Sequence, residues 1–157
     1  MRRLLLVVLT ALLFVASAGC SKSYIPNTDI ENSGENLKVI QFCERYRHAV
    51  QDKNVAELLR LASPAYFSSS VRNEDIYDYN GLRDYLTQTF VKTNGIRYEI
   101  RYRKITYTET NHILVDYTYS GSFRIPGIKG DEWRHKVADN RLELVRDGES
   151  YRIASGM

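Results

Sequence analysis

The sequence predicts an α+β domain in which three N-terminal helices pack on a curved, bulged antiparallel sheet. Three observations lead to this fold class. Apolar residues recur every three or four positions up to about residue 94, they alternate from residue 96 onward, and the alternation changes parity within the sheet region. The change of period marks helices followed by strands, and a parity change requires an extra residue that bends a strand. We therefore expect a cone-shaped sheet with its helices on one face.

The first predicted helix runs from about residue 35 to 52. A second, short helix follows from Asn54, an N-cap with Glu57 three residues later, and ends at Ser63-Pro64. A third begins near Asn80 and ends at "KTNG", where we expect Gly95 to adopt the left-handed C-cap conformation. The stripe of the first helix consists of Val39, Phe42, Cys43, Tyr46, Ala49 and Val50.

The first predicted strand begins after Gly95 and places apolar residues on one face. That set then shifts to Ile105 and Tyr107, which predicts a β-bulge near Arg103-Lys104. After the turn "TETN", alternation from Ile113 to Phe123 indicates a half-buried antiparallel partner. The inward residues of the two strands include Ile96, Tyr98, Ile100, Tyr102, Val115, Tyr117 and Tyr119.

The rest of the sheet is predicted from "RIPGIKGDE", residues 124–132, which we expect to be a loop. Beyond it, Trp133, His135 and Val137 are expected to face the concave side. Leu142 and Leu144 have the other parity, so we expect a second bulge within residues 138–141. The sequence "RDGES" predicts a hairpin turn into the last strand.

Residues 1–19 have the order of a secretory signal. Arg2 and Arg3 precede an apolar run from Leu4 to Ala16, and small residues follow. The run is shorter than the ~20 residues that cross a bilayer, so we expect removal of the segment. Cut before Cys20, it resembles the bacterial lipoprotein signal, although Ser17 stands where that family usually has an aliphatic residue. The alternative is an ordinary cut near Ala18 that leaves Cys20 as a free thiol.

The resemblance implies that Cys20 carries lipid and attaches the protein to a membrane. The chain has two cysteines, so acylation of Cys20 leaves Cys43 without a disulfide partner, and Cys43 is predicted to be a core residue. Ser21 follows the lipid site, and the resemblance then implies a bacterial envelope protein on the outer membrane, facing the periplasm, if the cell has two membranes.

Composition predicts one domain. Residues 20–35 are polar and contain Pro26 and Gly34, so we expect a flexible tether ahead of a domain spanning residues 36–157. Removal of residues 1–19 takes Lys+Arg from 22 to 20 against 19 Asp+Glu, and the net charge from +3 to +1. With no basic tail and no glycine-rich phosphate loop, we expect no nucleic-acid partner.

The domain resembles the nuclear transport factor 2-like superfamily. The resemblance rests on "ERYRHAVQDKNVAELLRLASPAYF" for two leading helices, "NGLRDYLTQTF" for the third and "LELVRDGESYRIAS" for the closing hairpin. It implies a cone whose mouth often holds a small apolar ligand. The superfamily includes ketosteroid isomerases, polyketide cyclases and many binding domains.

The isomerase branch of the superfamily places a tyrosine in an oxyanion hole, and Tyr46 matches that position. A carboxylate base should follow the second helix, to transfer a proton beside an apolar substrate. The matching position falls near Ser70, and Glu74 and Asp75 reach it only with a loop insertion. We therefore predict no catalytic residue, and Tyr46 is read as a core tyrosine or a pocket residue.

Aromatic residues on the predicted concave face are the candidates for a ligand pocket, because phenol rings combine apolar area with a polar tip. The same residues can instead fill the core of a curved sheet. His135 can line the pocket or act as a base. His48 falls on a helix surface and His112 near a turn, so no metal-ligand cluster is expected. No metal and no cofactor is predicted. The pocket candidates are Tyr46, Tyr98, Tyr102, Tyr117, Tyr119, Trp133 and His135.

Three functions remain open from the sequence. The first is a lipid-anchored, non-catalytic domain that binds a small apolar ligand or an envelope protein. The second is an isomerase- or cyclase-type enzyme that uses Tyr46 with His135 or an acid from Glu74-Asp75, and the third is a structural accessory of a secretion or cell-wall complex. We expect a monomer or weak homodimer, since the predicted outer sheet face is highly charged, with Arg97, Glu99, Arg101, Asp116, Arg134 and Lys136.

Overall fold

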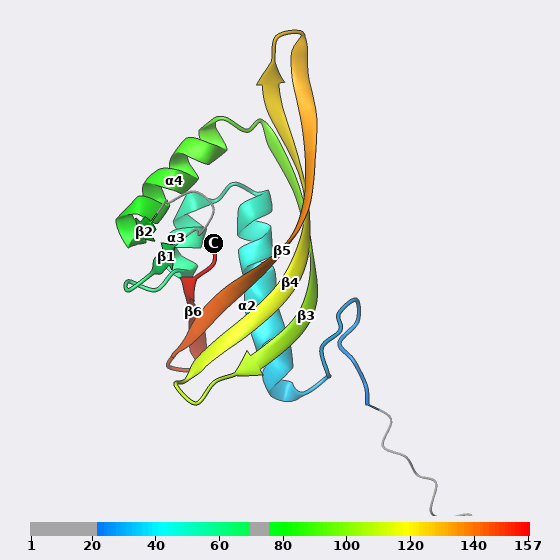
Figure 1. Cartoon of the computed structure of the whole chain (residues 1–157), viewed down its shortest axis with the longest axis vertical. Helices are drawn as coiled ribbons and strands as arrows, with labels where there is room; N and C mark the ends of the chain where they lie inside the picture. Colours follow the sequence, from blue (N-terminus) through cyan, green and yellow to red (C-terminus); the bar gives the residue numbers. More distant parts are fainter. Residues whose placement is uncertain (1–21, 70–75) are drawn as a thin grey trace, which may run out of the picture.

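The computed structural model describes residues 22–69 and 76–157 and places three helices on one side of a curved sheet (Figure 1). The helices are α2 (Gly34–Gln51), α3 (Val55–Leu61) and α4 (Tyr79–Val91). The antiparallel sheet has the order β3-β4-β5-β6, and β1 (Phe67–Ser69) pairs separately with β2 (Ile76–Asp78). Its strands are β3 (Gly95–Tyr107), β4 (His112–Gly127), β5 (Gly130–Asp147) and β6 (Ser150–Ser155). The predicted α+β class and curved antiparallel sheet are confirmed.

Each helix begins at a side chain that satisfies a free backbone N–H of the first turn. Ser33 Oγ accepts from the Asn36 N–H at 3.1 Å, Asn54 Oδ1 from Glu57 at 3.0 Å, and Asp78 Oδ1 from Gly81 at 2.8 Å. The predicted C-cap at Gly95 is wrong. Helix α4 ends at Lys92 in a right-handed conformation, and Gly95 is the first residue of β3.

The core lies between α2 and the concave face of the sheet. The predicted stripe of α2 is buried, apart from half-buried Val50, and α3 and α4 add Leu58, Leu61, Leu82 and Leu86. A fully buried side chain of this kind stabilises the fold by about 1.5–3 kcal/mol. These contacts hold the three helices over the lower part of the sheet.

One of the two predicted bulges is at its expected place. The β3–β4 register shifts between Tyr102 and Lys104, so Arg103 is the extra residue. The bulge predicted within residues 138–141 is wrong, because β4 and β5 pair without a shift from His112↔Val145 to Gly127↔Gly130. The second irregularity lies instead in the β5–β6 pairing, between Glu143 and Leu144.

Residues 124–132 were expected to form a loop, and this prediction is also wrong. They form the end of a β4–β5 hairpin that extends past the helices (Figure 1). Pro126 is tolerated there because β3 starts at Gly95, opposite Arg124, so β4 has a strand on only one side beyond that point. Gly130 has a φ of 119°, which favours glycine at the turn.

The N-terminal strap, residues 22–33, replaces most of the predicted flexible tether. Ile25 and Ile30 are buried at 6% and 3% exposure, and Tyr24 forms an isolated β-bridge with Glu31. The Asp29 N–H donates to the Tyr102 carbonyl at 3.0 Å, which fixes the strap on the free edge of β3. The tether prediction is therefore wrong for these residues, since two isoleucines flanking a Pro-Asn turn supply enough apolar surface to dock the segment.

Candidate functional site

The tyrosines predicted on the concave face do come together inside the cone. Tyr46 from α2, Tyr98 from β3 and Tyr117 from β4 are buried, and their side chains hydrogen-bond to one another. The rings of Tyr46 and Tyr98 meet edge to face, with centroids 6.5 Å apart. Burial raises the pKa of all three phenols, so they remain neutral hydroxyls near neutral pH.

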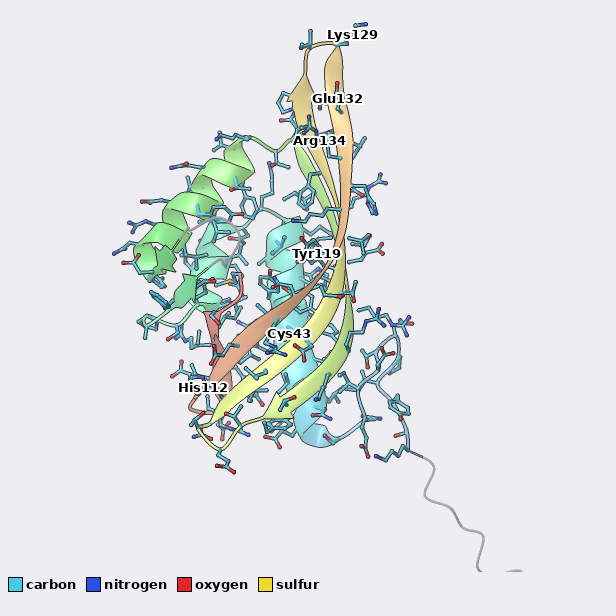
Figure 2. All side chains as sticks on the ribbon, viewed as in Figure 1. Cys43, His112, Tyr119, Lys129, Glu132 and Arg134 are labelled. Carbon is cyan, nitrogen blue, oxygen red and sulfur yellow. The ribbon has the colours of Figure 1, made fainter. Side chains whose placement is uncertain are left out.

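Tyr102 and Tyr119 flank this cluster in different ways. The Tyr102 hydroxyl donates to Glu44 Oε1 at 2.8 Å, and Arg47 holds the other oxygen of Glu44 at 2.8 Å. Burial raises the pKa of Tyr102, whose hydroxyl is thus committed to α2. Tyr119 is half-buried and packs on Tyr98 at 5.4 Å between centroids, where the sheet faces α2 (Figure 2).

The C-terminal segment closes the cone over the tyrosines. Asn140 Nδ2 donates to the Tyr117 hydroxyl at 3.0 Å and to the Gly156 carbonyl at 3.1 Å. The Tyr66 hydroxyl accepts from the Met157 N–H at 3.1 Å. Neither Asn140 nor Tyr66 was among the predicted site residues. Asn140 follows a charged run, where the sequence pattern gives no sign of an inward amide.

The described interior contains no group suited to acid–base chemistry near neutral pH. Among residues 22–69 and 76–157, no Asp, Glu, His, Lys or Arg is buried, and the buried polar residues other than tyrosines are Ser63 and Thr93. Burial raises the pKa of the Cys43 thiol, which keeps it protonated and unreactive. Ser70, Glu74 and Asp75 lie outside the described residues.

Trp133 and His135 do not face the tyrosines. The unbroken β4–β5 register pairs them with Arg124 and Ser122 on the outer, convex face. The Trp133 ring lies beside the Arg97 and Arg124 guanidinium groups, at 5.0 and 6.0 Å, and is 50% exposed. His135 Nδ1 is 3.1 Å from Ser122 Oγ.

Arg134 and Lys136 consequently lie on the inner side of β5. The same register pairs them with Phe123 and Gly121 of β4, beyond the part of the sheet that the helices cover (Figure 2). They were predicted on the outer face, so the orientation of all four side chains is corrected. On a hairpin that leaves the core, both faces meet solvent, and apolar alternation no longer indicates the inward side.

Three hollows of the described surface lie outside the cone. The outer groove, of about 540 Å³, runs between the strap and the outer sheet face. It adjoins a shallow hollow of about 670 Å³ across β3, β4 and β5, which shares Arg103 and Thr118 with it. A third hollow, of about 360 Å³, lies between the strap, α2 and β3. The outer groove is lined by Asn27, Thr28, Glu99, Ile100, Arg101, Arg103, Thr118, Tyr119 and Ser120.

Ion pairs organise the walls of the outer groove. The Asp29 carboxylate accepts from Arg101 at 2.8 Å and Arg103 at 3.0 Å. These hydrogen bonds, Arg101 first, lower the pKa of Asp29. Further along the face, Arg141 donates to Asp116 at 2.6 Å, a bond that raises the pKa of Arg141. The face is charged but balanced, since each of these arginines has an acidic neighbour.

The part of the chain that the structure describes shows neither a metal-binding cluster nor a membrane-spanning helix. It holds no cluster of three or more His, Cys, Asp or Glu side chains that could bind a metal ion. None of its helices has the length and apolar character needed to cross a membrane. Cys20 lies outside the described residues, so its lipidation stays a prediction.

Comparison with known proteins identifies the fold. No family model and no curated protein matches the chain. A candidate dehydratase of the NTF2-like family from Streptomyces avermitilis superposes with a TM-score of 0.67 at 11% identity, over 77% of this chain and 92% of that one. A candidate scytalone dehydratase from Novosphingobium aromaticivorans gives 0.65 at 11% identity, over 78% and 80%.

A protein of another kind has the same architecture. A candidate association domain of a calcium/calmodulin-dependent protein kinase II from Xanthomonas campestris gives a TM-score of 0.64 at 14% identity, over 87% of this chain and 91% of that one. At such identities the likeness shows the fold and leaves the activity open. The domain therefore has the nuclear transport factor 2-like fold.

Proposed function

We propose that this protein is a lipid-anchored component of the bacterial cell envelope and that its domain binds another envelope protein without catalysing a reaction. The signal-like residues 1–19 and the position of Cys20 support the anchor. Two or three acyl chains hold a protein on a bilayer firmly, since each buried CH₂ contributes about 0.8 kcal/mol.

The observation that favours a protein partner over a small ligand is that tyrosine side chains occupy the interior of the cone. Tyr46, Tyr98 and Tyr117 satisfy their hydroxyls among themselves, and the segment that contains Gly156 covers them. An apolar ligand would have to displace that segment. An enzyme of this fold would need an acid or base in the mouth that titrates near neutral pH, and no Asp, Glu, His, Lys or Arg is buried in the described interior.

The outer groove is the surface that we propose for binding the envelope protein. It offers hydrogen-bonding groups from three sources: the strap, β3 and β4. Its paired charges favour a polar, mixed-charge protein surface over a single anion or an apolar molecule. Ser120 lies on the outer face in the middle of this surface, paired with Glu99 on one side and Val137 on the other.

A second candidate function is an enzyme related to the dehydratases of the same fold. Its support is the presence of two candidate dehydratases among the structures that superpose on this chain. An acid from Glu74 or Asp75 would have to supply the base, with Tyr46 binding the substrate oxygen. A single apolar molecule bound to the purified protein, and turned over by it, would favour this function.

Native mass spectrometry of the protein extracted from its own membranes in mild detergent tests the proposal. We expect the mass of the chain from Cys20 with two or three acyl chains, no small apolar molecule, and a second protein in the complex. Ser120→Arg should remove that second protein. Gln88→Arg, on the exposed surface of α4, adds the same charge away from the groove and should keep it.

Three results would each contradict one part of the proposal. A chain with an unmodified Cys20 would remove the anchor, and Cys20→Ser supplies the reference mass. An additional small molecule in the domain, released on denaturation, would replace the protein partner with a ligand. A complex equally stable in the two arginine variants would remove the outer groove from the interface.

A further inference from the structure

The part of the β4–β5 hairpin that extends past the helices, residues 121–138, is called here the upper hairpin (Figure 1). It carries large apolar side chains that the core does not use. Ile128 is fully exposed at its tip, and Trp133 and Val137 are exposed on β5. Three of the nine exposed large hydrophobic residues of the described chain thus lie within this one hairpin, and exposed apolar groups that gather in this way mark an interaction site.

The upper hairpin also has a net positive charge. Four basic residues stand against two acids, namely Arg124, Lys129, Arg134 and Lys136 against Asp131 and Glu132. Among the basic residues, Arg124 alone has an ion pair within residues 22–69 and 76–157, with Asp131 at 3.4 Å. The arginines around the outer groove differ, because each has an acidic neighbour within 3.0 Å. The other basic side chains of the upper hairpin are therefore free to meet negative charge from outside the chain.

Trp133 lies among cationic groups at the base of the upper hairpin. The guanidinium of Arg97 is 5.0 Å from the centre of its ring, and that of Arg124 is 6.0 Å away. For the Arg97 side chain, the ring is the one partner within the described part of the chain, so its N–H donors are available to an anion. An exposed indole ring beside arginines is typical of segments that lie at the boundary between lipid headgroups and acyl chains.

The cations lie on both faces of the upper hairpin. Arg97 and Arg124 are on the outer face with Trp133, whereas Arg134 and Lys136 are on the inner face. An acidic protein docked on one face would reach only one of these pairs. A lipid surface that meets the edge and tip of the hairpin presents phosphates beside both faces, and β4 has no neighbouring strand on that edge beyond Arg124. The distribution of charge therefore favours a lipid surface over a protein.

We propose that the upper hairpin binds the anionic headgroups of a phospholipid surface, with the Trp133 ring at the level of the headgroups. Its arginine and lysine side chains are long enough to reach phosphates from either face, and Ile128 and Trp133 supply the apolar contact that interfacial segments use. So small a contact is weak by itself. It rests on the proposed function in one respect, since acyl chains on Cys20 would keep the hairpin at a high local concentration beside the bilayer.

The test uses the fluorescence of Trp133, which reports on the hairpin alone because it is the single tryptophan of the chain. The chain extracted from its membranes is reconstituted with vesicles of phosphatidylcholine, or of phosphatidylcholine mixed with phosphatidylglycerol. We expect the emission to move to shorter wavelength with the anionic vesicles only. Lipids brominated near the top of the acyl chain should quench it there, and high salt should reverse both effects by screening the charges.

A pair of double variants tests the role of the charges. Arg134→Glu with Lys136→Glu reverses two exposed cations of the upper hairpin and should abolish the shift in emission. Lys38→Glu with Arg83→Glu makes the same change in charge on the exposed surfaces of α2 and α4 and should keep the shift. Because all four side chains are exposed, the urea midpoint of unfolding should stay close to that of the unchanged chain in both variants.

The inference is wrong if Trp133 emits alike in neutral and anionic vesicles, or if both double variants keep the shift. It is also wrong if the shift requires a co-extracted protein, because the hairpin would then bind an acidic protein surface. Neither Ile128 nor Trp133 lines the outer groove, so these results leave the protein-binding proposal untouched. Retention of the chain on the vesicles in high salt reports the acyl anchor separately.

Discussion

The two edges of the sheet are treated differently by the rest of the chain. The β3 edge is covered by the strap, which contributes a backbone hydrogen bond to Tyr102 and buries Ile25 and Ile30. Among residues 22–69 and 76–157, nothing covers in this way the edge of β5 that faces away from β4, called here the β5 edge, between residues 131 and 139. An unpaired edge invites association with other strands, so covering one edge and leaving the other open restricts association to one place on the molecule.

The β5 edge itself divides into an open and a closed part. Asn140 marks the division, because its amide joins the buried Tyr117 hydroxyl to the Gly156 carbonyl. Strand β6 pairs with β5 from Glu143 to Asp147, whereas residues 131–139 have a paired strand only on the β4 side. Substitutions in the strap, at Asn140 and at Asp29 can therefore test how each edge is covered.

Removing the apolar contact of the strap should have the largest effect. Ile30→Ala deletes a side chain that is 3% exposed and leaves a cavity against β3, which we expect to lower the free energy of unfolding by about 2–5 kcal/mol. Urea unfolding followed by circular dichroism measures it. Tyr24→Ala, at a position 55% exposed in the same strap, should change it by less than about 0.5 kcal/mol. Equal effects would mean that the strap does not close the β3 edge by burial.

Opening the closed part of the β5 edge should have an intermediate effect. Asn140→Ala removes the amide that bonds to Tyr117 and Gly156, and we expect a loss of about 1–2 kcal/mol in the free energy of unfolding. Hydrogen exchange should also rise at residues 155–157. Lys136→Ala, on the same face of β5 but in the bare part, should leave both measurements unchanged. A similar loss in Lys136→Ala would contradict the division of the edge at Asn140.

Breaking the ion pairs of the strap should have the smallest effect, and one that depends on pH. The pKa of Asp29 is lowered by hydrogen bonds from Arg101 and Arg103, so its carboxylate stabilises the folded state above the ordinary pKa of 3.8 and loses that contribution as pH falls through the lowered value. Asp29→Asn should therefore reduce the urea midpoint at pH 7, and the difference from the unchanged chain should disappear in strong acid. Asp147→Asn, whose partner Arg152 lies on β6, provides the matched loss of an ion pair away from the strap. A difference that persists below pH 2 would show that the Asp29 charge is not the cause.

The covered half of the fold could be predicted from the sequence. Where one face of an element packs on a core, the period of apolar residues identifies that face, and this gave the three helices and the bulge at Arg103. The face of Tyr98 and Tyr117 followed from the same rule. These predictions depend on burial, and burial is strong in the lower part of the sheet.

The uncovered half could not be predicted in this way. Trp133 and Val137 alternate as core residues do, yet they lie on a solvated hairpin, where alternation carries no information about direction. Pro126 indicated a loop because the sequence does not reveal that β4 lacks a second neighbour there. The role of Asn140 depends on the path of the segment after β6, which no local pattern fixes.

The position of the strap bears on how the domain would be oriented relative to a membrane. It covers the edge of β3, and only Ser21 separates Lys22 from Cys20, so acyl chains on Cys20 would start within about 10 Å of the strap. Acyl chains on Cys20 would then hold the β3 edge of the domain close to the lipid headgroups.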